Sequence, residues 1–364
     1  MPDTLTPDTF TKLAYQTFQQ GKQYFGLAHK TISSRIMNTV FPKPQEEPNP
    51  LTPKMMSLLQ ARMNALIAVD WQEAEAGVYP KSLLFENRWD DFFRYYPMMC
   101  LDIPGIWQRA NSKRHQEFST GINTEGYPDY YVQNFHHQTD GYFSDMSANL
   151  YDLQVEVLFN GTADPMRRRI LVPLKRHVEK MQAQQQNVQA LQPVKVLDVA
   201  CGTGHSLQMI RATLPQASLY GLDLSPAYLR KANQLLSEDA GILPQLVHAN
   251  GEQMPYLDNY FEAVTSTFLF HELPADARQN VIDEAYRVTK PGGVFIICDS
   301  VQLSDSPEFT PMMENFPAIF HEPYYRHYTT DDLVKRLEQA GFVNVTTANH
   351  FMSKYWVAEK PAGE

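Results

Sequence analysis

Two carboxylates and two glycines have the spacing that a nucleotide site needs. Asp198 lies inside an apolar run, and a turn of small residues containing Gly202 and Gly204 follows directly. Glycine permits positive φ angles and close approach of the backbone to a ligand, and free N–H groups at the start of a helix favour a polar or anionic group. Asp223 ends the next apolar run, where a carboxylate can accept both hydroxyls of a ribose. These residues predict a nucleotide-type site.

The order of the small residues decides which nucleotide is expected. A dinucleotide site needs a third glycine, but Leu207 stands at that position. The pattern D-x-A-x-G-x-G instead resembles the first motif of class I S-adenosylmethionine (SAM)-dependent methyltransferases, with Ala200 in place of its first glycine. The resemblance implies that the turn holds the methionine end of SAM and that Asp223 holds the ribose. The alternative is a Rossmann-like domain with a degenerate pocket. The cofactor contacts implied in this part of the chain are Asp198, Ala200, Cys201, Gly202, Gly204, Asp223 and Leu224.

A second group of candidates follows the third expected strand, because ligands of open α/β sheets lie beyond the carboxyl ends of the strands. Asn250, Gly251 and Glu252 occupy that position. The segment is similar to one in the ubiquinone/menaquinone C-methyltransferases, which usually have Asp in place of Asn250, and the resemblance implies a contact with adenine. An Asn-Gly pair is also a favoured turn, so a plain turn is the alternative.

The fourth expected strand ends in Phe268, with His271 close behind. This segment also resembles the menaquinone methyltransferase group, in which the resemblance implies that methyl donor and acceptor meet here. We predict Phe268 as a cofactor contact. His271 is the candidate catalytic base, since an imidazole titrates near neutral pH; the alternative is a histidine that orients a loop or packs against SAM. The segment lacks the N/D-P-P-F/Y signature of DNA and protein-glutamine methylation, which disfavours those acceptors.

Two aromatic stretches could cover the site. The insertion (residues 301–328) contains Tyr324 and Tyr325, resembles the cap of the same group and suits a greasy or aromatic substrate. The aromatic segment (residues 127–143) contains His137 and Tyr142, and it resembles the segment before the core of cyclopropane-fatty-acid synthase type methyltransferases, where such a stretch closes over SAM. Ordinary packing is the alternative for both. Adjacent histidines near Asp140 lack a third well-spaced ligand, so we expect no metal site.

From residue 195 onward, strands and helices alternate, which predicts a parallel sheet with right-handed crossovers. The whole pattern resembles the class I methyltransferase topology: a seven-stranded, mostly parallel Rossmann-like α/β sheet that ends in an antiparallel hairpin. We expect a SAM-binding domain over 191–364 and a mainly helical domain or lid over 1–190. The expected strands are 194–199, 218–222, 245–248, 261–269, 294–298, 343–347 and 355–359, and the expected helices between them are 205–214, 226–236, 275–288 and 331–340.

The N-terminal half reads as helices separated by proline-rich connections. Helical spacing of apolar residues covers much of 1–40. Starts and caps for later helices are expected at Thr52-Pro53, Ser147, Asp164-Pro165 and Thr330. The helix that starts at Pro165 is expected to run to about Gln185. We expect a linker at 41–53, short helices and loops around Pro97 and Pro104, and a surface connection at 182–192.

Composition narrows the class of protein. The 364 residues carry a net charge of −10, which disfavours nucleic acid as a partner. Three scattered cysteines without a C-x-x-C pattern argue against disulfides and zinc and favour a reducing compartment. No segment reaches 18 consecutive apolar residues, and the N-terminus lacks a signal-like pattern. We expect a cytoplasmic protein without an integral membrane segment; the oligomeric state is not indicated.

Together these features predict transfer of a methyl group from SAM, with S-adenosylhomocysteine as product, to a small, fairly hydrophobic or aromatic acceptor at oxygen or carbon. The N-terminal helices would then form the lid and the wall that selects the substrate. Two alternatives remain open at this point. One is a protein side-chain methyltransferase, whose helical half would dock the partner along an open groove. The other is a non-catalytic module that binds SAM or S-adenosylhomocysteine.

Overall fold

The computed structural model describes residues 7–40, 51–184 and 193–363. A seven-stranded sheet with strand order β3-β2-β1-β4-β5-β7-β6 forms its centre. β1 to β5 are parallel, and β7 runs antiparallel to both β5 and β6. This confirms the predicted α/β sheet with its C-terminal antiparallel hairpin. The strands are β1 (Lys195–Val199), β2 (Ser218–Asp223), β3 (Gln245–His248), β4 (Phe261–Thr267), β5 (Thr289–Ser300), β6 (Val343–His350) and β7 (Ser353–Glu359).

The central strands are apolar because helices bury both faces of the sheet. Leu197 of β1 pairs in register with Val264 of β4, and both are fully buried. The next pair in the same register is polar: Asp198 lies beside Thr265, and the Thr265 hydroxyl donates to Asp198 Oδ1 over 2.6 Å. A buried polar pair is tolerated when it is hydrogen-bonded, so this pair can bring a carboxylate into the core next to the glycine-rich turn.

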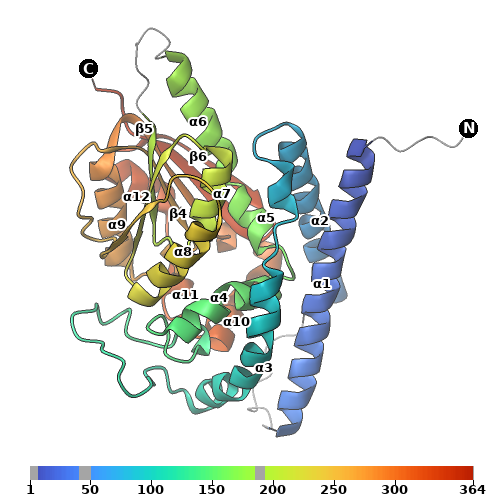
Figure 1. Cartoon of the computed structure of the whole chain (residues 1–364). Helices are drawn as coiled ribbons and strands as arrows, with labels where there is room; N and C mark the ends of the chain where they lie inside the picture. The colour runs from blue at the N-terminus through green and yellow to red at the C-terminus, as the bar shows by residue number, and fades with distance from the viewer. Residues whose placement is uncertain (1–6, 41–50, 185–192, 364) are drawn as a thin grey trace, which may run out of the picture.

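Helices cover the two faces of the sheet in the alternating way that the sequence predicts (Figure 1). α9 (Ala275–Val288) and α12 (Leu333–Ala340) pack on one face, where Leu197 is buried. α6 (Leu171–Gln184), α7 (His205–Thr213) and α8 (Pro226–Glu238) pack on the other, where Val196 is buried. α7, α8 and α9 begin where the sequence places them. The carboxyl ends of the parallel strands are thereby left for the segments that build the site.

One of the helices before the sheet is longer than expected. These helices are α1 (Pro7–Val40), α2 (Pro53–Glu75), α3 (Trp89–Ser112), α4 (Asp145–Leu158) and α5 (Ala163–Arg168). The prediction of short helices and loops around Pro97 and Pro104 was wrong, because α3 continues through both prolines. Tyr95 and Met99 of α3 are buried against Leu150 of α4. Packing of this apolar face thus outweighs the hydrogen bonds that the prolines cannot donate.

Some predicted helix boundaries also shift. Thr52 caps α2 as expected and accepts a hydrogen bond from the Met55 N–H over 3.2 Å. The cap of α4 is Ser144 rather than Ser147, and the cap of α12 is Asp332 rather than Thr330. The helix predicted from Pro165 to Gln185 is divided into α5 and α6 by a turn at 169–170. The connections expected at 41–50 and 185–192 lie outside the described residues, and the domain boundary near residue 190 stays a prediction.

A buried charge pair connects three of these early helices. The guanidinium of Arg168 in α5 makes two hydrogen bonds to the carboxylate of Asp70 in α2, over 2.9 and 2.7 Å. The hydroxyls of Tyr15 in α1 and Tyr79 also donate to this carboxylate. The third donor of the Arg168 fork reaches the carbonyl of Leu83 over 3.0 Å. Both charges are therefore satisfied inside the protein, as stable burial of an ion pair requires.

The insertion follows β5 and folds into short helices. η4 (Leu303–Asp305), η5 (Pro307–Phe309), α10 (Thr310–Phe320) and α11 (Tyr325–Tyr328) lie on the same side of the sheet as α3 and α4 (Figure 1). Three further single turns are η1 (Lys81–Leu84), η2 (Phe135–His137) and η3 (Phe270–Glu272). η2 and η3 carry site residues described below.

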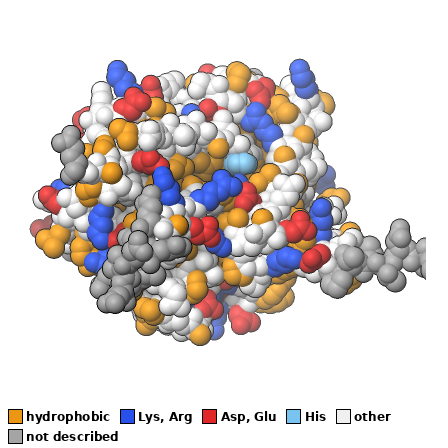
Figure 2. Space-filling view, turned by 90° about the horizontal axis from the view of Figure 1, so that it is seen from above, with side chains coloured by type: hydrophobic (Ala, Val, Ile, Leu, Met, Phe, Trp, Pro, Cys, Tyr) orange, Lys and Arg blue, Asp and Glu red, His pale blue; other side chains and the backbone are white. Residues whose placement is uncertain are grey.

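Acidic and basic side chains are interspersed over the face seen in Figure 2, and hydrophobic side chains line a hollow near its middle. Across the described ranges of the chain, no helix has both the length and the apolar content needed to cross a membrane.

Candidate active site

The glycine-rich turn lies between β1 and α7 and has an unusual backbone. Ala200, Gly202 and Gly204 have φ angles of 57°, 53° and 86°, all in the left-handed region. A Cβ atom added at Gly204 would lie 3.0 Å from the Cβ of Ala232 in α8, so the glycine is also required by close packing. The N–H of Cys201 donates to the carbonyl of Leu222 over 3.0 Å, which fastens the turn to the end of β2.

Asp223 ends β2 and faces this turn. Its Oδ2 accepts the N–H of Gly202 and its Oδ1 accepts the N–H of Ser225, each over 2.8 Å. Burial raises the pKa of Asp223. Each carboxylate oxygen has a further lone pair, so both oxygens can still accept a hydroxyl from a ligand. The turn and this carboxylate therefore fit the methionine and ribose ends of SAM.

Asp198 lies below the turn and is almost completely buried. Burial raises its pKa to about 7, although the hydrogen bond from Thr265 acts in the opposite direction. The nearby charge of Asp223 contributes to this rise. The two acids predicted from the sequence are thus brought together at adjacent strands.

The segment after β3 closes the other side of this region. Asn250 accepts the N–H of Glu252 at its side-chain oxygen over 2.9 Å, which stabilises a turn at this position. A Cβ atom at Gly251 would lie 3.2 Å from Val199. Leu224 presents its carbonyl to His248, with 3.0 Å between oxygen and Nε2.

The aromatic segment crosses the carboxyl ends of three strands. Tyr130 donates its hydroxyl to Glu252 after β3 over 2.6 Å. The Ser225 hydroxyl after β2 donates to the Tyr142 carbonyl over 2.5 Å, and the Tyr142 hydroxyl donates to Glu272 after β4 over 2.5 Å. The segment therefore lies over the edge of the sheet where the predicted cofactor residues gather.

His137, by contrast, does not reach the predicted site. It is buried against His115 and His321, with ring centroids 5.6 and 5.8 Å away; we call these three residues the imidazole cluster. Burial and, to a smaller extent, the neighbouring imidazoles together lower the pKa of His137 to about 3. Asp140, which the sequence suggested as a companion ligand, instead accepts the Ser119 N–H over 2.7 Å.

His271 lies in η3, just beyond β4. Phe268, which precedes it, has a φ of 59° and donates its N–H to the Cys298 carbonyl. His271 Nδ1 is 2.6 Å from Oδ1 of Asp299, which ends the buried part of β5. Burial lowers the His271 pKa, but the carboxylate of Asp299 outweighs burial and raises it to about 10. In this state His271 carries a proton at neutral pH, which is opposite to the state that a general base needs.

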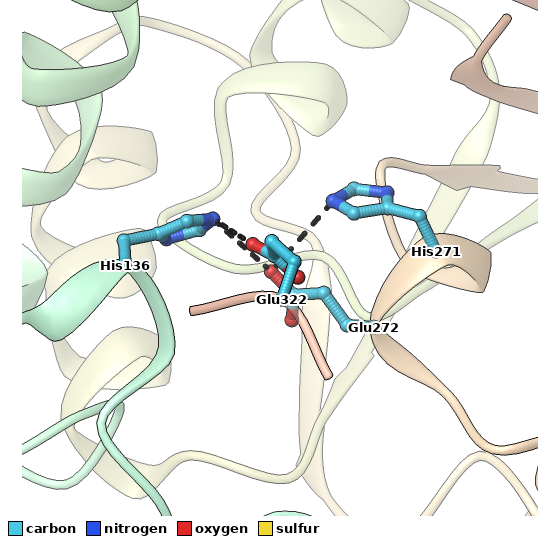
Figure 3. Close-up of side chains that lie close together, drawn as sticks. All are labelled: His136, His271, Glu272 and Glu322. Atoms are coloured by element: carbon cyan, nitrogen blue, oxygen red, sulfur yellow. Dashed lines mark ion pairs between the residues drawn. The ribbon is translucent and has the colours of Figure 1, made fainter. Parts of the chain in front are cut away.

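Four ionisable side chains converge beside His271 (Figure 3), and we call His136, His271, Glu272 and Glu322 the His/Glu cluster. One ligand atom from each lies within 4.8 Å of the others. His136 Nε2 is 2.5 Å from Glu322 Oε1 and 3.8 Å from Glu272 Oε1, and His271 Nε2 is 4.0 Å from the same Glu272 atom. Burial and, next, the charge of Glu322 raise the pKa of Glu272 to about 7, against the opposing effect of the two histidines.

The insertion covers the ends of β4 and β5. The Tyr325 hydroxyl is 2.9 Å from the Ser300 hydroxyl, and its ring meets the ring of His271 edge-on at 6.2 Å. Tyr324 packs edge-on against Tyr130 of the aromatic segment, with centroids 6.5 Å apart. Both predicted tyrosines of the insertion therefore lie near the strand ends.

Sequence reasoning missed His205, the first residue of α7. Its Nδ1 lies 3.5 Å from Asp164 in α5, and its Nε2 lies 3.8 Å from Asp152 in α4. Burial lowers the His205 pKa, but the two carboxylates raise it to about 9. The glycine-rich turn is thus connected to the N-terminal helices by a buried ion pair. Sequence reasoning also gave no site role to His136, Glu272, Asp299 and Glu322. The one feature of the sequence that could have pointed to this group is that Glu272 directly follows His271.

Known proteins resemble the sheet-forming part of the chain. A family model described as a methyltransferase domain matches residues 196–293. A demethylmenaquinone methyltransferase of Geobacillus sp. (strain WCH70) is 30% identical over 202 residues, which cover 50% of this chain and 86% of that protein. The same-named protein of Anoxybacillus flavithermus (strain DSM 21510 / WK1) is 29% identical over 197 residues, covering 49% and 82%. A SAM-dependent methyltransferase from Aquifex aeolicus is 19% identical, with 50% and 88% covered and a TM-score of 0.35.

The matched region includes the glycine-rich turn and both acids, Asp198 and Asp223. The strand order and the antiparallel β7 agree with the topology that the sequence predicted. The chain therefore belongs to the class I SAM-dependent methyltransferases, in the group that includes the demethylmenaquinone methyltransferases, and SAM is its methyl donor.

Proposed function

We propose that this methyltransferase acts on a small, fairly hydrophobic or aromatic acceptor, at an oxygen or a carbon atom. The observation that carries the proposal is the double cover over the strand ends. The aromatic segment and the insertion meet there, with contacts such as Tyr130 to Tyr324 and Gln133 to His321. A covered site lined by aromatic residues suits a small apolar molecule, whereas a protein substrate needs an open groove. The relatives named for demethylmenaquinone support the same acceptor class.

The residues near β1, β2 and β3 would hold the cofactor. Asp223 would accept the ribose hydroxyls, and the backbone at Gly202 and Gly204 would receive the methionine end. Asn250 and its neighbours would lie beside adenine. We assign supporting contacts to Asp198, Ala200, Cys201, Leu224, Gly251, Glu252 and Phe268.

SAM carries its methyl group on a positively charged sulfur and is an intrinsically strong donor. The work of this chain is therefore to align the acceptor and to exclude water. Tyr142 and Tyr325 would do this from the aromatic segment and the insertion. His271 is our candidate for the group that contacts the acceptor. With a pKa of about 10 it would donate a hydrogen bond to an acceptor oxygen, and it could act as a base only after losing its proton.

The proposal is tested by incubating the purified full chain with methyl-labelled SAM and a fractionated lysate of the source cell. Label in the solvent-extractable fraction is expected, and mass spectrometry would then identify the acceptor. Label on protein would contradict the proposal in favour of a docking role for the helices. Absence of label in every fraction, despite SAM binding measured by calorimetry, would also contradict it. The Asp223→Ala variant is the matched blank, because it should lose label together with SAM affinity.

A further inference from the structure

The His/Glu cluster brings donor atoms of three distant segments to one point. His136 comes from the aromatic segment, His271 and Glu272 follow β4, and Glu322 comes from the insertion (Figure 3). Each residue presents either an imidazole Nε2 or a carboxylate oxygen to the centre of the cluster. Such side chains are the usual protein ligands of transition-metal ions.

The buried carboxylate of Glu322 has fewer partners than its burial requires. Its side chain is fully buried, and within the described residues neither of its oxygens has a partner in good hydrogen-bond geometry. Its Oε1 forms an ion pair with His136 Nε2, whereas Oε2 forms no ion pair within the described residues. Leaving such a group unsatisfied is costly. A cation held between Glu322 and Glu272 would satisfy both carboxylates at once.

Two of the four side chains, His271 and Glu272, are held in place by hydrogen bonds of the kind that orients metal ligands. His271 turns Nδ1 toward Asp299 over 2.6 Å, which leaves Nε2 facing the cluster. A carboxylate behind an imidazole in this way orients the ring and increases its basicity toward a metal. Glu272 receives the Tyr142 hydroxyl over 2.5 Å, so this carboxylate is also held in place.

We propose that His136, His271, Glu272 and Glu322 form a binding site for a divalent first-row transition-metal ion such as Zn²⁺. The mixed set of two imidazoles and two carboxylates favours such an ion over Mg²⁺ or Ca²⁺, which prefer oxygen ligands alone. With metal–ligand bonds of about 2.1 Å, neighbouring donor atoms of one ion lie roughly 3–3.5 Å apart. The separations of 2.5, 3.8 and 4.0 Å lie on both sides of this range, so small side-chain shifts would form the site.

This metal site differs from the arrangement of adjacent histidines near Asp140 that the sequence analysis considered. The adjacent histidines near Asp140 gave no third ligand, and we expected no metal. In the structure His137 lies in the imidazole cluster, and Asp140 accepts a backbone N–H. The missing ligands come instead from the ends of β4 and from the insertion. The proposal concerns binding alone. A bound ion would occupy His271 Nε2, so in that state His271 would not donate to the acceptor; the acceptor class proposed above rests on the aromatic cover and is unchanged.

The rival explanation is a metal-free network of ion pairs. In that network a proton on His136 Nε2 would point at Glu322, and Gln138 would donate to His136 Nδ1, which lies 3.4 Å from its amide nitrogen. Such a network and a metal site predict different results in solution. The network binds no metal. In that case the Glu322→Gln variant would change only the number of protons bound by the remaining residues of the network.

The test measures metal binding to the full chain. The purified protein is stripped with EDTA, dialysed, and titrated with Zn²⁺ by calorimetry; the bound metal is then counted by mass spectrometry after buffer exchange. We expect about one equivalent to be retained. Glu322→Gln and His136→Gln should each weaken Zn²⁺ binding by about tenfold or more. His137→Gln is the matched control, because this neighbour faces the imidazole cluster, and it should retain the metal.

Two further readouts keep the outcome clear. Co²⁺ should give visible absorption bands in the wild-type protein that Glu322→Gln loses. SAM affinity, measured on the same samples, shows whether each variant is folded. Retention of no metal by a protein that binds SAM would overturn the proposal and leave the methyltransferase assignment standing. Equal retention by the wild type, Glu322→Gln and His136→Gln would place the ion elsewhere and would also overturn it.

Discussion

Two sites share the carboxyl edge of the sheet, and they are built by different means. The first, over β1 to β3, consists largely of backbone: a turn with three left-handed residues, its N–H groups, and the carboxylate of Asp223. The second, over β4 and β5, is the His/Glu cluster, which consists of four ionisable side chains from three segments. The first is fixed by the sheet itself, whereas the second exists only when the aromatic segment and the insertion are in place.

This difference implies that the two sites can be disabled separately. A change in the glycine-rich turn should affect the sheet and the cofactor, and a change in the His/Glu cluster should leave both intact. The following predictions test this separation.

The largest expected effect is on the backbone-built site. Gly204→Val should lower the free energy of unfolding by about 2–4 kcal/mol, because it combines a φ of 86° with a Cβ atom 3.0 Å from Ala232. Gly77→Val is the control, since Gly77 has a similar φ of 76° but no atom within 4 Å of an added Cβ. Chemical denaturation measures both. A loss as large at Gly77 would show that backbone strain alone is responsible.

Removal of the Asp223 carboxylate should affect SAM binding without affecting the His/Glu cluster. Asp223→Ala should weaken SAM binding by about 1–3 kcal/mol, because the ribose hydroxyls lose their acceptor, and it should leave any metal content unchanged. Calorimetry with SAM measures the affinity. The exposed Asp276→Ala serves as control. Unchanged affinity in Asp223→Ala would contradict the ribose assignment.

The ion pair behind the turn predicts a pH dependence of stability. The folded-state pKa of His205 is about 9, above the ordinary value of 6.5, because Asp152 and Asp164 face it. Protonated His205 therefore stabilises the fold fully below about pH 6.5, and this contribution is lost as the pH rises toward 9. We expect a loss of about 3 kcal/mol across this window, because each pKa unit corresponds to about 1.4 kcal/mol. His205→Gln should flatten the curve; an equally steep curve in that variant would assign the loss to other groups.

The smallest effect concerns the residue that connects the two regions. Ser225 caps α8 by accepting the Tyr228 N–H over 3.2 Å, and it donates to Tyr142 of the aromatic segment. Ser225→Ala should cost about 1 kcal/mol of stability and should increase proteolysis within residues 127–143. Thr52→Ala removes the cap of α2, a helix outside this segment, and should leave proteolysis of the segment unchanged. Equal cleavage in both variants would contradict the connecting role of Ser225.

The sequence correctly places the glycine-rich turn and the strands around it because this information is local. Asp198, Gly202 and Gly204 lie within seven consecutive residues, and the strands around them follow from apolar runs. The alternation of strand and helix then gives the topology. The extent of α3 could not be predicted in this way, because its two prolines favour loops locally and only the contact with α4 outweighs them.

The His/Glu cluster could hardly be predicted from the sequence. His136 and Glu322 are separated by nearly two hundred positions, and no local pattern relates them. In addition, each has a neighbour with different contacts: His137 and His321 belong to the imidazole cluster, while His136 and Glu322 belong to the His/Glu cluster. The left-handed backbone at His136 and His321, with φ of 54° and 49°, accompanies this division. Such a backbone follows from the surrounding structure and not from the residue types.

The buried pair of Arg168 and Asp70 has a consequence for how such a protein can change over generations. Its charges lie on α5 and α2, and tyrosines from two other places complete their hydrogen bonds. A recombination event that joined a foreign segment to the chain between α2 and α5 would leave Arg168 buried without its counter-charge, at a cost of about 3–5 kcal/mol. The segment from α2 to α5 is therefore expected to be inherited as one unit, and exchange of N-terminal helices between lineages should succeed only when both partners of the pair are exchanged.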